Sequence, residues 1–405
     1  MTQFKNAETQ AIRLQYERTE NKEHSVPLYL TSSYVFDDAE DMRSQFAEEK
    51  EGHVYSRYAN PNVEELIGKL AALEGAESGW ATATGMAAVF SFFGAILKSG
   101  DHVVSSRSVF GSTHKLFTEI LPKWGIETTY VDFDNYEGFE NAILPNTKIL
   151  YVETPSNPAL DIIDLEKLGE IAEANNLIFA VDNCFATPYL QQPLKFGAHV
   201  SIHSATKYID GQGRTLGGAI LASHEIIEKV KAFARHSGPA ISPFNAWTLS
   251  KSLETLHVRM DRHCDNALVI SKRLEAHNAV DSVKYPFLPS HPHYEIAKKQ
   301  MKSGGGIVTF QLKSGLEGGR KFLNALKLFS LTANLGDVRS IATHPASTTH
   351  SKLIPEQRAD VGISDGLVRL SIGLEHVDDI WEDLETALDA SHANLSVSNE
   401  YLVNT

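Results

Sequence analysis

Residues 200–218 read VSIHSATKYIDGQGRTLGG, and the rest of the chain is interpreted outward from this stretch. It opens with apolar, strand-like residues and then presents Ser204, Thr206 and Lys207 close together. Lysine can form a Schiff base with a carbonyl group, and neighbouring hydroxyls can donate hydrogen bonds to phosphate. The glycine-rich turn that follows lacks the helix start and spaced acidic residue of a dinucleotide fingerprint. The stretch indicates a nucleophilic amine beside a phosphate site; a solvated lysine at a strand end is the alternative.

A second strand-like run, LIFAVD at residues 177–182, ends in Asp182. In a parallel sheet the carboxyl end of such a strand faces the ligand crevice. A buried Asp needs a partner, and a protonated pyridine nitrogen would serve; an Asp that caps the following loop is the alternative. Taken with Lys207, the pair predicts a pyridoxal 5'-phosphate (PLP) site. Asp182 would keep the ring nitrogen protonated and Lys207 would hold the aldehyde.

Three motifs, AVDN, SATKYIDG and VRLSIGLE, resemble those of the Cys/Met-metabolism (trans-sulfuration) family of PLP-dependent enzymes, and the resemblance runs from about residue 10 to 393. It implies a fold-type I, aspartate aminotransferase-like transferase. This fold has a mostly parallel sheet in a large domain and a smaller α/β C-terminal domain. The segments DGQGR, SPFNAW, NLGD and HPASTTH are most similar to members that make L-homocysteine from O-succinyl-L-homoserine and sulfide, a step of methionine biosynthesis.

The order of strand and helix patterns predicts the same architecture from the residues alone. Strand-like runs lie at residues 79–83, 102–105, 126–131, 148–152 and 177–181, with helical patterns between them. This alternation predicts a doubly wound, mostly parallel sheet. Further strands are expected at 306–312 and 367–372. We therefore expect an N-terminal arm at 1–59 that contacts a neighbouring subunit, a PLP-binding domain at 60–255 and a C-terminal domain at 256–405, with a strand-like run at 26–36.

Composition limits the classes of partner and compartment. The net charge is −14 and no basic block is present, which argues against nucleic acid and anionic membranes as partners. The two cysteines form no CxxC pair, and the amino end is polar, so we expect a cytoplasmic protein without a disulfide framework. No histidine or cysteine spacing predicts a metal site. Small-molecule substrates remain as the expected partners.

Two segments are candidates for the cofactor phosphate. Tyr55 and Arg57 are two positions apart, so both face the same way in an extended segment; surface residues ahead of a helix are the alternative. Gly85 and Met86 open a helix directly after a strand, where free N–H groups favour an anion, as in many α/β folds. The resemblance implies that Gly85, Met86, Ser204 and Thr206 bind the phosphate of their own subunit.

The resemblance also implies that Tyr55 and Arg57 bind the phosphate of the neighbouring subunit. The active sites would then need a homodimer, and such dimers usually pair into a homotetramer. Phe110 stands where the family has a stacking tyrosine; it can stack on the pyridine ring but cannot move a proton. Without the resemblance, a core phenylalanine would be the better interpretation.

The substrate carboxylate is expected at Arg369. An arginine in an apolar strand needs a buried anion, and a structural salt bridge is the alternative. The resemblance implies that Asn157 and Asn334 assist Arg369, and that Asn157 also contacts the cofactor's 3-oxygen. Asn157 alone would be interpreted as a turn former before proline. Ala333 stands where cystathionine-handling relatives often carry glutamate, which favours sulfide as the nucleophile.

Arg214 is the candidate for the second carboxylate of a succinyl ester, because it follows Lys207 in the glycine-rich turn. The alternative is that Arg214 only holds that turn. Other functions stay open on this scaffold: cystathionine γ-synthase, O-acetylhomoserine sulfhydrylase, a methionine or cystathionine γ-lyase, or a PLP-fold module without turnover. Ser112 argues against a lyase, since the family's methionine lyases favour cysteine there, and intact Lys207, Asp182 and Arg369 argue against the module.

Overall fold

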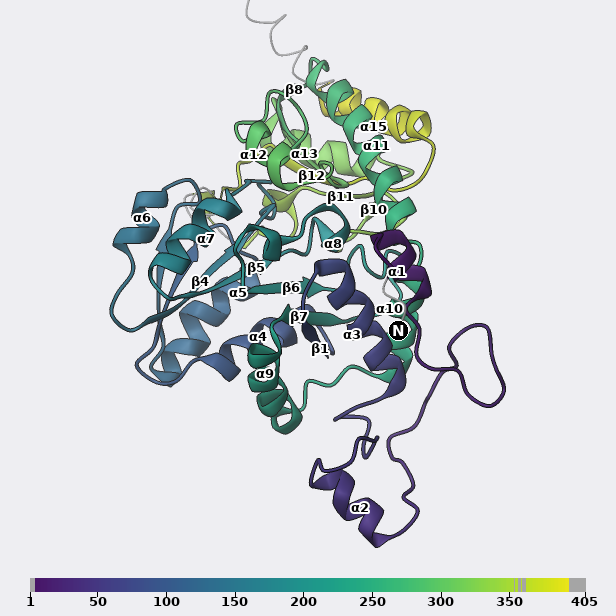
Figure 1. Ribbon diagram of the computed structural model, residues 1–405. Helices are drawn as coiled ribbons and strands as arrows, with labels where there is room; N and C mark the ends of the chain where they lie inside the picture. The colour runs from purple at the N-terminus through teal and green to yellow at the C-terminus, as the bar shows by residue number, and fades with distance from the viewer. Residues whose placement is uncertain (1–3, 353, 356–357, 359–361, 393–405) are drawn as a thin grey trace, which may run out of the picture.

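Two β-sheets organise the chain, a seven-stranded sheet and a five-stranded sheet. The computed structural model describes residues 4–352, 354–355, 358 and 362–392. In Figure 1 the larger sheet occupies the centre of the molecule and the smaller sheet lies above it, while the segment that carries α2 (Ala39–Phe46) projects away from both. The sheets are thus formed by successive parts of the chain.

The larger sheet has the strand order β1-β7-β6-β5-β4-β2-β3. Its strands are β1 (Ser78–Thr82), β2 (His102–Ser106), β3 (Glu127–Val131), β4 (Thr147–Glu153), β5 (Ile178–Asp182), β6 (Val200–Ser204) and β7 (Gly218–Ala222). Only β7 runs against the other six, because it pairs antiparallel with both β1 and β6. The predicted mostly parallel sheet is confirmed, and the strands expected from the sequence match β1 to β5 within one or two residues.

Helices cover both faces of this sheet, as its doubly apolar strands require. One face packs against α4 (Gly85–Ile96) and α9 (His224–Ser237). The opposite face packs against α3 (Pro61–Glu74), α7 (Leu165–Ala174) and α10 (Pro243–Leu253). Among the described residues, no helix combines the length and apolar character needed to cross a bilayer.

Shorter helices connect these layers. They are α1 (Ala7–Arg13), α5 (Gly111–Lys115), the π-helix η1 (Leu116–Ile120), η2 (Leu121–Trp124), α6 (Tyr136–Asn141), α8 (Thr187–Leu190), η3 (Pro193–Phe196) and η4 (Pro345–Ser347). Their shortness keeps the strand ends close to the helices that follow, which fixes the loops of the site described below.

The smaller sheet has the order β10-β11-β12-β9-β8. Its strands are β8 (Val280–Lys284), β9 (Ile307–Leu312), β10 (Ser330–Leu331), β11 (Ile341–Thr343) and β12 (Leu367–Ser371), and its helices are α11 (Leu256–Glu275), α12 (Tyr294–Gln300), α13 (Gly315–Ala325) and α15 (Val377–His392). A separate apolar cluster joins β9 and β12 to α11, α13 and α15. This arrangement is compatible with the proposed boundaries at 59 and 255, which remain a prediction.

The strand expected at residues 26–36 is not formed. This segment makes only an isolated bridge between Ser33 and Tyr55. A strand needs a neighbour for its N–H and C=O groups, and this part of the arm lies away from both sheets (Figure 1). Val26, at its start, is buried, but two later apolar side chains stay uncovered: Leu30 is 70% exposed and Val35 is 99% exposed. The strand-like pattern therefore marks a segment without a partner strand among the described residues.

Candidate active site

The carboxyl ends of three neighbouring parallel strands bring the predicted residues to one edge of the large sheet. β4 ends at Glu153, β5 at Asp182 and β6 at Ser204. Their mutual pairing is parallel, so these ends meet at the same edge. Lys207 follows β6 by three residues, in the turn that leads to β7. This is the position at which open α/β sheets bind ligands.

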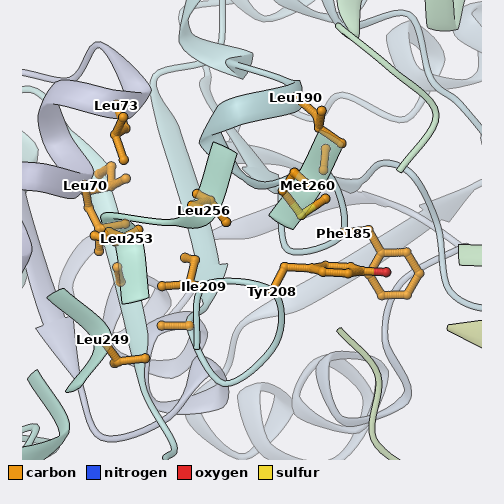
Figure 2. Packing of buried hydrophobic residues seen from close by; sticks show 14 of the residues in the cluster. Leu70, Leu73, Phe185, Leu190, Tyr208, Ile209, Leu249, Leu253, Leu256 and Met260 are labelled. Carbon is orange, nitrogen blue, oxygen red and sulfur yellow. The ribbon is translucent and has the colours of Figure 1, made fainter. Parts of the chain in front are cut away.

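The backbone that directly follows Lys207 is held by contacts with α11 and with the loop at Gly336. Tyr208 is fully buried in the core cluster of Figure 2. Arg259 of α11 donates from Nη1 to the Tyr208 carbonyl at 2.6 Å and from Nη2 to the Ile209 carbonyl at 3.2 Å. Gly336 has φ +76°, and a Cβ there would lie 2.7 Å from the Tyr208 nitrogen. Lys207 therefore extends its side chain from a turn whose backbone is held by buried contacts.

The amine of Lys207 reaches toward the smaller sheet. Its Nζ donates to Oδ1 of Asn334 at 2.6 Å. Burial lowers the pKa of Lys207 below its usual value, and the nearby Arg369 acts in the same direction. A lowered pKa increases the fraction of neutral amine, the form that attacks a carbonyl or accepts a proton.

Arg369 lies in β12, and its guanidinium contacts Asn334, the residue that also contacts Lys207. Nη1 donates to Oδ1 of Asn157 at 2.9 Å, and Nη2 donates to the Asn334 carbonyl at 3.2 Å and to Oγ1 of Thr343 at 3.4 Å. In the part of the chain that the structure describes, no ion pair neutralises it. Burial lowers the pKa of Arg369 to about 10. Within the described ranges, only neutral groups contact this buried cation. It is therefore suited to bind the carboxylate of a ligand.

Asp182 is a buried carboxyl on the other side of Lys207. Burial raises its pKa from 3.8 to about 6, while the Cys184 N–H, His203 and Tyr151 oppose that rise. The Cys184 N–H donates to Oδ1 at 3.1 Å. A cationic ring nitrogen beside this carboxyl would relieve the cost of its ionisation.

The predicted phosphate residues also meet at this edge. Thr84 caps α4 by accepting from Ala87, which leaves the first N–H groups of the helix, those of Gly85 and Met86, without helical partners. A Cβ on Gly85 would lie 2.6 Å from the Cβ of Ser204, so only glycine permits this approach. Thr206 accepts from the Gly217 N–H at 3.1 Å. The donors form a cradle for an anion.

Phe110 and Asn157 complete the predicted set at this edge. Phe110 precedes α5, and its ring is 43% exposed, so it is not the core phenylalanine of the alternative interpretation. Asn157 lies four residues beyond the end of β4 and contacts Arg369 through its side chain. The ring of Phe110 is therefore free to cover a ligand.

Tyr55 and Arg57 are not brought to Lys207 by their own chain. Arg57 donates from Nη1 to the Arg235 carbonyl, and its guanidinium lies 5.4 Å from the ring centre of Tyr55 and 4.9 Å from that of Tyr58. Tyr55 is 39% exposed. Their predicted role in a neighbouring subunit stays a prediction.

Arg214 makes the contacts expected of a residue that holds the glycine-rich turn. Its Nε and Nη2 donate to Oδ1 of Asp210 at 3.1 and 2.9 Å, and Nη2 donates to Oγ of Ser252 at 2.5 Å. Its N–H also donates to Asp210 at 2.7 Å. These bonds close the glycine-rich turn on itself. We therefore expect Arg214 to hold the turn, and its contact with a succinyl group stays an untested prediction.

The sequence reasoning missed several supporting residues. Thr343 contacts Arg369, Arg259 holds the backbone after Lys207, and Gly336 packs on that backbone. Thr343 and Arg259 carry no signal in the sequence, because their partners lie far away along the chain. Gly336 did carry one, since it belongs to the NLGD segment that drew attention to Asn334.

The chemistry of these groups fits PLP. The glycine cradle and its hydroxyls suit the phosphate, Asp182 suits the ring nitrogen, and the buried amine of Lys207 suits the aldehyde. Together with the mostly parallel sheet, they define a PLP-dependent enzyme of fold type I. The chain belongs to the Cys/Met metabolism PLP-dependent enzyme family, whose model matches residues 8–389. The predicted family, fold class and cofactor are thus confirmed.

The relatives of this chain include enzymes with two different activities. The chain is 47% identical over 383 residues to O-succinylhomoserine sulfhydrylase of Pseudomonas aeruginosa, covering 95% of each protein. It is 45% identical over 368 residues to L-methionine gamma-lyase of Fusobacterium nucleatum, covering 90% of this chain and 93% of the relative. Similar identities to relatives with two different activities agree with the Cys/Met metabolism family and leave the particular substrate to the proposal below.

Solved structures share the whole fold. The crystal structure of metB from Corynebacterium glutamicum superposes with a TM-score of 0.89 at 39% identity, covering 95% of this chain and 98% of that one. The structure of metY from Campylobacter jejuni superposes with a TM-score of 0.91 at 34% identity, covering 95% and 100%. It contains a pyridoxyl-lysine monophosphate, so a lysine of that protein carries the cofactor.

Proposed function

We propose that this protein is an O-succinylhomoserine sulfhydrylase, which converts O-succinyl-L-homoserine and sulfide into L-homocysteine and succinate. One observation carries the proposal. A continuous set of contacts joins the amine of Lys207 to Asn334, Arg369 and Asn157. An α-amino acid bound by its carboxylate at Arg369 would thus have its α carbon beside Lys207.

Each residue has a defined task in this reaction. Bound PLP holds the substrate amino group and withdraws electron density from the α carbon. Asp182 keeps the pyridine nitrogen protonated, which strengthens that withdrawal. Lys207 would accept the α proton, pass it on so that the amine is neutral again, and only then accept a proton from the β carbon, because the ring of Phe110 has no hydroxyl to do so. The γ-succinate would leave with its bonding electron pair, hydrosulfide would add at the γ carbon, and Lys207 would return one proton to the β carbon and one to the α carbon.

The loop at Asn334 has no acidic residue at position 333, and this favours sulfide over cysteine as the nucleophile. Ala333 is exposed and carries no charge for the distal amine of cysteine. Sulfide requires no such partner. Ser112, where the family's methionine lyases favour cysteine, supports replacement over γ-elimination. The relative from Pseudomonas aeruginosa, named O-succinylhomoserine sulfhydrylase, supports the same activity.

The proposed assembly is a homodimer of active sites, with a homotetramer as its expected paired form. The arm supports it, because Leu30 and Val35 stay exposed in the single chain and Tyr55 and Arg57 lie away from their own Lys207. In the proposed dimer, the second subunit covers these apolar side chains.

A crossed assay tests the proposed function. Purified holoenzyme is given the succinyl, acetyl or phosphoryl ester of homoserine, each with sulfide or with cysteine, and homocysteine and cystathionine are quantified. We expect homocysteine from the succinyl ester with sulfide at the highest kcat/KM. A larger kcat/KM for the acetyl ester, or for methionine breakdown to 2-oxobutyrate without added sulfide, would replace this assignment with the corresponding alternative.

A further inference from the structure

A buried glutamate that has no role so far lies beside the predicted cofactor residues. Glu153 ends β4, is 5% exposed, and pairs in register with Asp182 at the end of β5. Residues in register on adjacent parallel strands point to the same face of the sheet. Tyr151, two positions earlier, lies on that face with α4. The two carboxyl groups are therefore neighbours beneath the site.

Glu153 contacts the backbones of two loops at once. The Phe110 N–H donates to Oε2 of Glu153 at 2.6 Å. A backbone hydrogen bond from Asn157 also reaches the same carboxyl. These loops follow different strands, β2 and β4, and one carries the ring expected over the cofactor while the other carries the amide at Arg369. The Glu153 side chain thus holds the loop of Phe110 and the loop of Asn157 at a fixed separation.

Phe110 depends on this contact for its orientation. It occupies the position before α5 and has no side-chain cap of its own, and α5 is only five residues long. Its ring is 43% exposed, so core packing does not fix it either. The bond to Glu153 holds the backbone from which the ring extends.

Burial and the neighbouring Asp182 raise the pKa of Glu153 well above its usual value. The other titratable groups at this face are Tyr151 and the Cys184 thiol, whose pKa values are also raised by burial. His203 lies on the opposite face, where it contacts Glu74 of α3, and acts on Asp182 only through its charge. The carboxyl of Glu153 keeps an oxygen that accepts the Phe110 N–H in either protonation state. Its raised pKa disfavours a second negative charge beside Asp182.

We propose that Glu153 is a positioning residue that fixes Phe110 and Asn157 around the cofactor without touching the substrate. This rests on the site assignments of the proposed function but not on the identity of the ester or nucleophile. Glu153 is not among the residues inferred from the sequence, although it lies only four positions before Asn157.

The test uses the holoenzyme variants Glu153→Gln and Glu153→Ala. Glutamine keeps a carbonyl oxygen for the Phe110 N–H, whereas alanine removes every acceptor. A lost hydrogen bond of this kind is worth about 0.5–1.5 kcal/mol, or about twofold to twelvefold in affinity. We expect Glu153→Ala to weaken PLP affinity by that factor and to reduce the visible circular dichroism of bound PLP. Glu153→Gln should retain most of both.

A double-mutant cycle separates positioning from general destabilisation. If Glu153 acts through Phe110, Glu153→Ala should reduce the circular dichroism signal much less in a Phe110→Ala background than in the native one. Equal, additive reductions in both backgrounds would overturn the proposal. So would a signal unchanged in Glu153→Ala holoenzyme of native Tm.

Glu65→Ala is the matched control for Glu153→Ala. Glu65 is also a buried carboxyl that accepts a backbone N–H, from Tyr16 at 2.9 Å, but it lies in α3. It should lower Tm without changing the cofactor's circular dichroism. The same change in both variants would make Glu153 an ordinary structural carboxyl. Because the signal comes from PLP itself, this result stands whichever substrate the crossed assay identifies.

Discussion

Lys207 is the residue whose removal has the clearest expected result. Lys207→Ala should fold, because Tyr208 and Arg259 hold the turn without the lysine side chain. Turnover should fall at least about 10²–10⁴-fold, the usual contribution of a positioned general base. Borohydride reduction of the native holoenzyme, followed by peptide mapping, should label Lys207. Label on another lysine would contradict the assignment of the site.

Arg214→Ala distinguishes a turn from a ligand site. Because Asp210 and Ser252 already engage the guanidinium, we expect kcat/KM to fall by a similar factor for the succinyl and acetyl esters. The two values are measured side by side on one preparation. A fall of about tenfold to a hundredfold confined to the succinyl ester would instead give Arg214 the second carboxylate.

Asp182 makes stability without cofactor depend on pH. Its pKa is about 6 in the folded chain and 3.8 ordinarily, so the folded state binds the extra proton. Its contribution to stability is full below pH 3.8 and is lost as the pH rises through 6. Relative to native protein, Asp182→Asn should gain on the order of 1–3 kcal/mol between pH 4 and 7. Urea unfolding of both cofactor-free proteins measures this; parallel pH curves would contradict it.

The residues that could be predicted are those whose chemistry is costly without a ligand. A buried aspartate, a buried arginine and a lysine among hydroxyls each need a partner, and the sequence places all three at strand ends or within strands. Thr343 and Arg259 are ordinary residues whose roles arise only from contacts distant in sequence. No local pattern distinguishes them from other threonines and arginines.

At the scale of elements, the start of α4 packs against the end of β6 so closely that no side chain fits at Gly85. Gly85→Ala would put a Cβ 2.6 Å from the Cβ of Ser204, so the helix or β6 must shift and the phosphate donors with it. We expect PLP affinity to fall at least about tenfold, measured by fluorescence titration of the cofactor-free protein.

Gly68→Ala is the control for that variant. It lies within α3, and a Cβ there meets nothing within 4 Å. Alanine is a better helix former than glycine by about 0.8–1.0 kcal/mol, so PLP affinity should stay native and Tm should hold or rise. If both variants lose affinity equally, close approach at Gly85 is not the cause.

Periodicity predicted the buried elements and failed on the exposed one. β5 matches its apolar run because both faces of the sheet are covered, which leaves the segment no other favourable place. Residues 26–36 carry an equally strand-like pattern but pair with no strand among the described residues, and their backbone bonds instead with side chains at α3 and α10. A pattern reports which side chains need covering, and it does not say whether the cover comes from the same chain.

At the scale of the whole molecule, the proposed dimer assigns that arm to a second copy of the chain. Arg57 and Lys207 would then belong to one active site but to different subunits. A subunit with Arg57→Ala supplies an intact Lys207, and a subunit with Lys207→Ala supplies an intact Arg57. In a hybrid dimer one of the two sites receives both intact residues, and the other receives neither.

Mixing the two variants therefore has a defined result. Random exchange makes half of the dimers hybrid, and one of their two sites is intact, so activity should recover toward about a quarter of native. The measurement is turnover at limiting PLP after joint unfolding and refolding, with differently tagged subunits to prove hybrid formation. Each variant refolded alone is the control and should stay low. Proven hybrids without recovery would mean that Arg57 serves its own subunit or no site, and the arm's exposed apolar residues would need another explanation.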